Sequence, residues 1–304
     1  MGQVAFVFAG QGAQYPGMGR SLCECSAAAA EVFRRADAIR PGTADMCFSG
    51  TAETLAETRN TQPCMYTVEM AAYAALREAG ISADAMAGFS LGELAALAAS
   101  GAVSFEAGLG LVIRRGALMQ EAAERAESAM AAVVGMAPDA LEALCGNYQQ
   151  VYPVNYNCPG QIAVSGAKAE MDAFKAAVKA AGGRAIPLRV KGGFHSPFMA
   201  AAAEGFAADL TAVEFASPAV PLYSDCTGLP YEGDFAALLQ KQIVSPVRWQ
   251  SIVEHMAANG VDTFIELGPG STLTGLISKT LSGVRTLRVE DADTLAEALK
   301  EMGA

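Results

Sequence analysis

The sequence predicts an α/β protein with a mostly parallel sheet, into which a small α+β domain is inserted. Short apolar runs alternate with amphipathic helical segments along most of the 304 residues, an order typical of a parallel sheet covered by helices. Between residues 127 and 191 the order becomes β-α-β-β-α-β, which is that of a ferredoxin-like unit. We therefore expect a large domain from residues 1–126 and 192–304, and a small domain from residues 127–191.

The first strand is expected over residues 4–8, a buried apolar run that leads into a glycine-rich loop. Gly10 and Gly12 begin a dinucleotide-binding fingerprint, but Tyr15 stands where its third glycine is required. The loop is therefore expected to bring its backbone close to a ligand or to the serine turn described next. Amphipathic patterns predict helices over residues 27–39, 52–58, 62–78 and 105–123.

A Gly-x-Ser-x-Gly motif, Gly88 to Gly92, lies between an apolar run at residues 83–87 and a helical run at residues 94–99. In this context the motif predicts a nucleophile elbow, a tight strand-to-helix turn that exposes the hydroxyl of Ser90. The free N–H groups at the start of the helix would face the reacting centre, and that of Leu91 is a natural oxyanion donor. A helix N-cap at Ser90 is the alternative interpretation.

The remaining elements follow from the same patterns. In the small domain we expect strands at residues 129–136, 151–157, 161–165 and 185–190, with helices at 139–144 and 170–181. The α/β pattern then resumes with helices at 198–212, 235–244 and 249–258, a helix from 271 and a terminal helix, and with strands at 220–224, 263–267 and 286–289.

Composition and charge exclude several classes of protein. The net charge of −11 argues against a nucleic-acid partner, and no apolar run is long enough and free enough of charge to predict a membrane span. Seven cysteines without C-x-x-C spacing favour reduced thiols over a disulfide framework or a zinc site. The N-terminus lacks the basic segment of a secretion signal, so a cytoplasmic location is expected.

A serine nucleophile needs a base, and the sequence holds two histidines. His255 lies within a predicted helix and is interpreted as structural. His195 lies in a loop between two glycines and Pro197, so it is the candidate base. No acidic residue between Ser90 and His195 stands out as a third member, and a carbonyl oxygen could orient the imidazole instead.

Arg115 lies on the predicted helix that follows the elbow helix. One interpretation is a surface arginine paired with an acid such as Glu121. The other is a guanidinium at an acyl site, where it would bind a carboxylate through two hydrogen bonds. The second interpretation predicts a substrate that is the thioester or ester of a dicarboxylic acid.

Seven ordered motifs are distributed over the chain. They are residues 8–14 with 17–19, the elbow with Glu93, Arg115 and Gly116 with Met119 and Gln120, residues 157–161, residues 193–197, Gln242 with residues 246–249, and residues 266–270. Together they resemble the malonyl-CoA:acyl carrier protein transacylases from end to end. The resemblance implies an α/β-hydrolase-like core with a ferredoxin-like insertion, and malonyl transfer from malonyl-CoA to an acyl carrier protein in fatty acid biosynthesis.

The resemblance also implies catalytic roles. Ser90 would be the acylated nucleophile and His195 its base, with the main-chain carbonyl of Gln242 orienting the imidazole. The backbone N–H groups of Gln11 and Leu91 would form the oxyanion hole. The mechanism would be ping-pong through a malonyl-serine, with no metal or bound cofactor.

Further residues would bind the substrate. Arg115 would hold the malonyl carboxylate, Gln11 and Asn157 would contact the substrate, and the ring of Phe194 would exclude an α-methyl group, as in related malonyl-selecting acyltransferases. Two positions depart from the family: Phe89 stands where a histidine is usual, and Cys158 where a serine is usual.

Three alternatives remain open: a trans-acting polyketide acyltransferase, a serine thioesterase or lipase, and a non-catalytic carrier-binding module. For the transferase we expect an acidic carrier to dock on a local basic surface, although the chain as a whole is acidic. The candidates for this surface are Arg184, Arg189, Lys191, Lys241 and Arg248.

Overall fold

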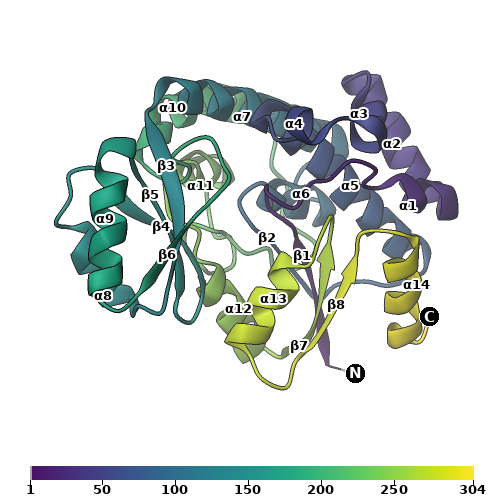
Figure 1. The fold of residues 1–304 in the computed structure, drawn as a ribbon. Coiled ribbons are helices and arrows are strands. Elements are labelled where there is room, and N and C mark those ends of the chain that lie inside the picture. Colours follow the sequence, from purple (N-terminus) through teal and green to yellow (C-terminus); the bar gives the residue numbers. More distant parts are fainter. Residues whose placement is uncertain (1) are drawn as a thin grey trace.

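Two sheets organise the molecule, as Figure 1 shows for a computed structural model in which residues 2–304 are described. The first sheet has the strand order β2-β1-β7-β8, and each neighbouring pair is parallel. Its strands are β1 (Gln3–Phe8), β2 (Ala85–Gly88), β7 (Val261–Leu267) and β8 (Arg285–Val289). The predicted α/β class with a parallel sheet is confirmed.

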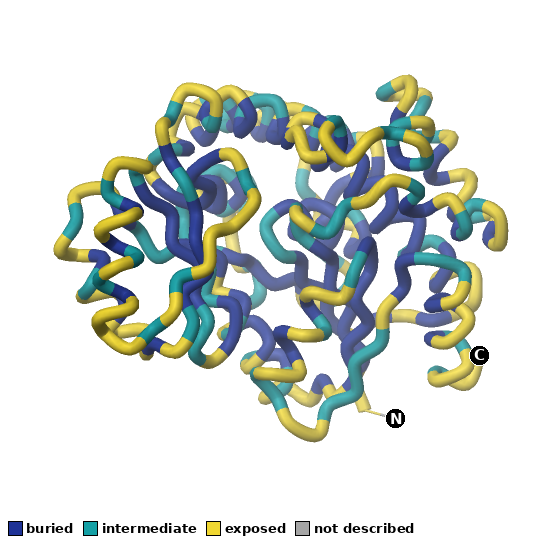
Figure 2. Tube along the Cα trace, in the orientation of Figure 1, coloured by how far each residue is buried: buried dark blue, intermediate teal, exposed yellow. Residues whose placement is uncertain are grey.

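Helices cover both faces of this sheet, because side chains of β1 alternate between them. Phe6 and Phe8 face the core shared with the long helix α5 (Thr58–Glu78), whereas Ala5 and Val7 face α12 (Trp249–Ala258) and α13 (Thr272–Thr280). Figure 2 shows the resulting buried centre, with most of the exposed residues on the outer helices and loops. The other helices of this part are α1 (Arg20–Cys25), α2 (Ala27–Ile39), α3 (Thr43–Ser49), α4 (Ala52–Leu55), α6 (Gly92–Ala99), α7 (Phe105–Arg125), α10 (Ala200–Thr211), α11 (Phe235–Gln242) and α14 (Ala292–Met302).

The second sheet is antiparallel, with the order β4-β5-β3-β6. Its elements are β3 (Ser128–Val134), α8 (Pro138–Cys145), β4 (Val151–Cys158), β5 (Gln161–Ala167), α9 (Lys168–Ala180) and β6 (Arg184–Pro187). The two helices pack on one face of the sheet around a separate apolar cluster, and form the left end of the molecule in Figure 1. The succession β-α-β-β-α-β is the one that the sequence predicts for residues 127–191.

Backbone hydrogen bonds connect the antiparallel sheet to the part of the chain that contains the parallel sheet. The N–H of Tyr156 on β4 donates to the carbonyl of Val247 over 2.9 Å, and the N–H of Val247 donates to the carbonyl of Val154 over 2.8 Å. Val247 lies just after α11, so an edge strand of the antiparallel sheet is fixed against the larger part of the chain. No helix among residues 2–304 is long and apolar enough to cross a membrane.

Some elements differ from the prediction. Helix α5 begins at Thr58 rather than at residue 62, and it includes Pro63. The expected strand at residues 220–224 is reduced to isolated bridges. One of them is a parallel bridge between Leu222 and Met86 of β2. The short helices α1 and α3 were not predicted, because neither has enough turns to show a periodic apolar pattern.

Candidate active site

The Gly-x-Ser-x-Gly motif forms the turn between β2 and α6. Ser90 adopts φ +55°, a left-handed conformation that is rare for a residue other than glycine. A Cβ atom on Gly88 would lie 1.9 Å from the carbonyl carbon of Gly92, and one on Gly92 would lie 2.2 Å from the carbonyl oxygen of Phe8. Glycine at both positions therefore allows α6 to begin against the end of β1, as expected of a nucleophile elbow.

The structure brings His195 to Ser90 from a point 105 residues further along the chain. His195 Nε2 lies 2.7 Å from Ser90 Oγ, and Nδ1 lies 2.9 Å from the main-chain oxygen of Gln242. Because a carbonyl oxygen can only accept, Nδ1 carries the proton and Nε2 is left to accept one from the serine. Burial, and secondly the positive charge of Arg115, lower the pKa of His195 to about 4, so the imidazole is neutral at neutral pH.

Arg115 is fully buried beside the serine. Its Nη2 lies 3.2 Å from Ser90 Oγ and 2.7 Å from the side-chain oxygen of Gln242, and its Nη1 lies 2.9 Å from that of Gln62. Burial lowers its pKa to about 10, which leaves the guanidinium charged at neutral pH. The alternative of a surface arginine paired with Glu121 is wrong.

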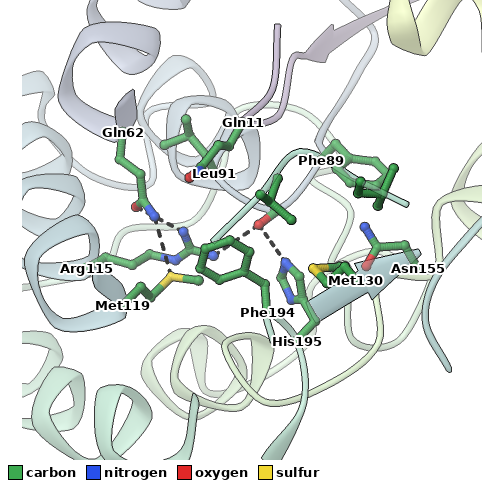
Figure 3. Close-up of a pocket in the computed structure, with 13 residues that line it drawn as sticks. Gln11, Gln62, Phe89, Leu91, Arg115, Met119, Met130, Asn155, Phe194 and His195 are labelled. Carbon is green, nitrogen blue, oxygen red and sulfur yellow. Dashed lines mark hydrogen bonds between the residues drawn. The ribbon is translucent and has the colours of Figure 1, made fainter. Parts of the chain in front are cut away.

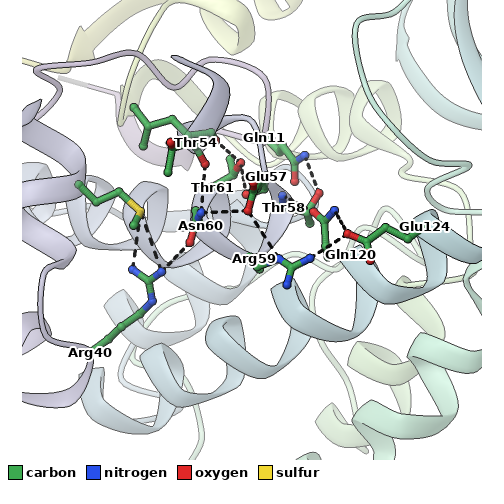
Figure 4. A network of polar contacts seen from close by, with 12 residues as sticks. Gln11, Arg40, Thr54, Glu57, Thr58, Arg59, Asn60, Thr61, Gln120 and Glu124 are labelled. Carbon is green, nitrogen blue, oxygen red and sulfur yellow. Dashed lines mark hydrogen bonds and ion pairs between the residues drawn. The ribbon is translucent and has the colours of Figure 1, made fainter. Parts of the chain in front are cut away.

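Gln11 and Leu91 both line the cavity at Ser90 (Figure 3). Within residues 2–304 neither N–H donates to a protein acceptor, so both are available to an oxyanion. The side chain of Gln11 donates to Thr58 Oγ1 over 3.2 Å, and the N–H of Thr58 donates to Gln120 over 2.8 Å. Figure 4 shows this polar network, which ties the glycine-rich loop to the start of α5.

The cavity has a volume of about 100 Å³ and is mostly apolar away from the arginine. Phe194 and Asn155 lie on its wall, together with Phe89, Met119, Met130, Leu188 and Val190 (Figure 3). The ring centroids of Phe89 and Trp249 lie 5.7 Å apart. Asn157 is buried but does not line this cavity; Asn155, two residues earlier on β4, does.

Sequence reasoning missed several polar residues behind the serine. Asp225 and Glu93 are fully buried; Asp225 Oδ2 accepts from the N–H of Ser90 over 2.7 Å, and Glu93 Oε2 accepts from the side chain of Gln242 over 2.6 Å. Glu93 lies directly after the elbow motif, but its position in the sequence does not indicate which residue it would hydrogen-bond. Asp225 directly follows the segment that pairs with β2. The only indication in the sequence was therefore its position at the carboxyl end of a predicted strand, where functional residues of parallel sheets gather.

The predicted basic residues are all exposed, namely Arg184, Arg189, Lys191, Lys241 and Arg248. Three of them lie on or just after β6, in the segment whose Leu188 and Val190 line the cavity. None of the five forms an ion pair with an acid in the part of the chain that the structure describes. Arg189 and Lys191, next to cavity-lining residues of this segment, therefore place positive charge close to the site although the chain as a whole is acidic.

Comparisons with known proteins agree over nearly the whole chain. Residues 5–300 match the model of a family described as "Acyl transferase domain". The chain is 38% identical to a malonyl CoA-acyl carrier protein transacylase of Bacillus subtilis, over 99% of this chain and 98% of the relative. It superimposes with a TM-score of 0.96 on a malonyl CoA-acyl carrier protein transacylase of Clostridium perfringens, at 36% identity, covering 99% of this chain and 97% of the other. It also resembles, at 33% identity and a TM-score of 0.94, a malonyl-transacylase solved in complex with a type II polyketide synthase acyl-carrier protein, covering 98% and 99% of the two chains.

Proposed function

Because this chain belongs to the acyl transferase family that includes the malonyl CoA-acyl carrier protein transacylases, we propose that it transfers the malonyl group of malonyl-CoA to the phosphopantetheine thiol of an acyl carrier protein, in fatty acid biosynthesis. The transfer proceeds through a malonyl ester of Ser90. The proposal needs no metal or bound cofactor. It includes a cytoplasmic location, which is supported by the free state of all seven cysteines.

The buried Arg115 is the observation that carries the proposal. Within residues 2–304 its guanidinium has no carboxylate partner. It lies 3.2 Å from the nucleophile and provides charge-assisted hydrogen bonds to an acyl group that ends in a carboxylate. A malonyl group has such a carboxylate one carbon beyond the carbonyl that Ser90 attacks. A simple thioesterase or lipase would gain nothing from a buried cation at this place.

In the first half-reaction, Ser90 Oγ attacks the thioester carbonyl while its proton passes to His195 Nε2. The developing oxyanion accepts hydrogen bonds from the N–H groups of Gln11 and Leu91. Collapse of the tetrahedral intermediate breaks the carbon–sulfur bond, and His195 returns the proton to the coenzyme A thiolate. Burial, and secondly the charge of Arg115, lower the pKa of His195; a carboxylate bound to Arg115 offsets the second cause and so makes the imidazole a stronger base.

In the second half-reaction, the carrier thiol gives its proton to His195 and the sulfur attacks the malonyl ester. The same oxyanion hole acts again, and the proton returns to Ser90 Oγ as the malonyl thioester leaves on the carrier. Asn155, whose side-chain oxygen is buried without a partner among residues 2–304, is placed on the cavity wall to contact the substrate.

The identity of the carrier is tested by direct transfer. We expect the enzyme with malonyl-CoA to add one malonyl group to a holo fatty acid carrier, seen as a mass shift, and to leave the apo carrier unchanged. A strong preference for a type II polyketide carrier would instead favour the trans-acting acyltransferase. This alternative is supported by the similarity to the malonyl-transacylase solved with such a carrier. Rapid release of free malonate without a carrier would contradict transfer and favour a hydrolase.

A further inference from the structure

Both polar groups of the Ser90 backbone are held by buried side chains. Its N–H donates to Asp225 Oδ2 over 2.7 Å, and its carbonyl accepts from the side-chain nitrogen of Gln242 over 2.7 Å. The same nitrogen lies 3.2 Å from Asp225 Oδ2, so the two holding residues also contact one another. The left-handed φ of +55° at Ser90 is a strained conformation that persists only where its surroundings enforce it.

The topology explains why Asp225 reaches the elbow. Residues 221–223 run beside β2, with hydrogen bonds from the N–H of Met86 to Pro221 and from the N–H of Tyr223 to Met86. Asp225 and Ser90 therefore follow two parallel neighbouring segments at their carboxyl ends, where the ends of such segments come together. Within residues 2–304 the carboxylate forms no hydrogen bond with His195, whose Nδ1 is bonded to the Gln242 carbonyl instead.

Asp225 also belongs to a charge cluster that reaches Arg115. Its own N–H donates to Glu93 Oε1 over 3.3 Å, and the hydroxyl of Tyr231 donates to the same oxygen. Burial, and then the charge of Glu93, raise the pKa of Asp225 far above its usual value, and burial raises that of Glu93. Asp225 and Glu93 therefore form a buried acidic pair close to the positive charge of Arg115.

We propose that Asp225 is a positioning residue for acyl transfer, which holds the Ser90 backbone so that Oγ stays in reach of His195. Asp225 thus binds the backbone of the nucleophile Ser90. His195, which an acid orients in many serine enzymes, is oriented here by the main-chain carbonyl of Gln242. The inference rests on the proposed function for its substrate. The hydrogen bond to the serine, rather than the negative charge, is the feature that matters.

The test compares Asp225→Leu, which keeps the size of the side chain without an acceptor, with Asp225→Asn, which keeps an acceptor oxygen. We expect the rate of Ser90 malonylation to fall roughly 10²-fold in the leucine variant, because a displacement of about 1 Å has that effect. The KM for malonyl-CoA should change little, and the asparagine variant should stay within roughly fivefold of the wild type. Asp225→Ala serves in the same comparison if the leucine variant does not fold.

A matched control separates positioning from general stability. Glu266 is also fully buried and accepts backbone hydrogen bonds at the start of α13, from Leu273 over 2.9 Å and Thr274 over 2.7 Å. Glu266→Ala should lower the melting temperature and leave the malonylation rate of the folded enzyme unchanged. Wild-type rates in folded Asp225→Leu or Asp225→Ala would overturn the inference, as would an asparagine variant as slow as they are.

A fluorophosphonate that labels reactive serines provides a readout that does not depend on malonyl-CoA. Labelling of Ser90 should slow in Asp225→Leu and recover in Asp225→Asn, in parallel with malonylation. If the wild type reacts with the fluorophosphonate but not with malonyl-CoA, the proposed function fails. The positioning role is then decided by the labelling rates alone.

Discussion

Arg115 Nη2 lies 3.2 Å from Ser90 Oγ and shares no hydrogen bond with a carboxylate anywhere in residues 2–304. Its partners are instead two amide oxygens, from Gln62 and Gln242, and the serine itself. A buried cation with neutral partners favours binding of an anionic ligand, because its hydrogen bonds to a carboxylate are stronger than those to the two amide oxygens.

Arg115→Ala should abolish the selectivity for malonyl over acetyl groups. The preference in the wild type is expected to be about 2–5 kcal/mol, the range for a buried charge left without its partner. The loss should fall on malonyl transfer, with acetyl transfer maintained or improved, and Arg115→Lys should restore little because an ammonium lacks the planar fork. The measurement is kcat/KM for both thioesters in all three proteins, and a ratio that survives in Arg115→Ala would assign the carboxylate to another residue.

The pH dependence of acylation should reflect the lowered pKa of His195. In the folded protein the pKa of His195 is about 4, below the usual 6.5. The imidazole therefore stays neutral and active as a base when the pH falls through 6.5. We expect kcat/KM for Ser90 acylation to stay level down to about pH 5 and to decline below it. In Arg115→Ala the midpoint should rise, since the arginine is one cause of the shift; a wild-type midpoint near 6.5 would contradict the buried, neutral imidazole.

Glu69 on α5 should make the protein less stable as the pH rises. Both of its carboxyl oxygens are buried without a hydrogen-bond partner among residues 2–304, and burial raises its pKa well above 4.5. Above the unfolded pKa the folded state must retain a proton that the unfolded chain releases, at about 1.4 kcal/mol per pH unit until the folded pKa is reached. Glu69→Met should therefore raise the melting temperature more at pH 8 than at pH 5. An equal gain at both pH values would show that Glu69 is not protonated in the fold.

Charge reversal on β6 and in the residues that follow it should affect the carrier alone. Changing Arg184, Arg189 and Lys191 to Glu is expected to raise the KM for an acidic carrier roughly tenfold, because exposed ion pairs contribute up to about 1 kcal/mol each. Acylation by malonyl-CoA without a carrier should stay unchanged. Lys300→Glu on α14, at the opposite end of the molecule in Figure 1, is the matched control. Unchanged carrier kinetics in the triple variant would remove this surface from docking.

Local patterns were sufficient to predict most of the fold. Helices α2 and α12 begin and end where their apolar periodicity does, and Gly88 and Gly92 locate the turn at Ser90 because no larger residue fits there. Helix α5 begins four residues before its predicted start and includes Pro63 beyond its first turn, where proline is rare because it cannot donate the helical hydrogen bond.

The site itself was predictable only in part. Ser90, His195 and Arg115 have distinctive neighbours in the sequence, whereas Asp225 acquires its contact from a segment 135 residues away. The same limit applies to Asn155 and Asn157. Two residues apart, they would share one face of a regular strand, but β4 shifts its register with β5 on both sides of them, and only Asn155 lines the cavity. Contacts of this kind follow from tertiary structure and leave no local pattern.

The most direct measurement is the intact mass of the enzyme after incubation with malonyl-CoA, followed by peptide mapping. The wild type should gain one malonyl group, located on Ser90, and lose it when a holo carrier is added. Ser90→Ala should gain none, and His195→Ala should gain it about 10²–10⁴-fold more slowly, as expected for loss of base catalysis. A full adduct on Ser90→Ala, or an adduct on another residue of the wild type, would contradict a mechanism through malonyl-Ser90.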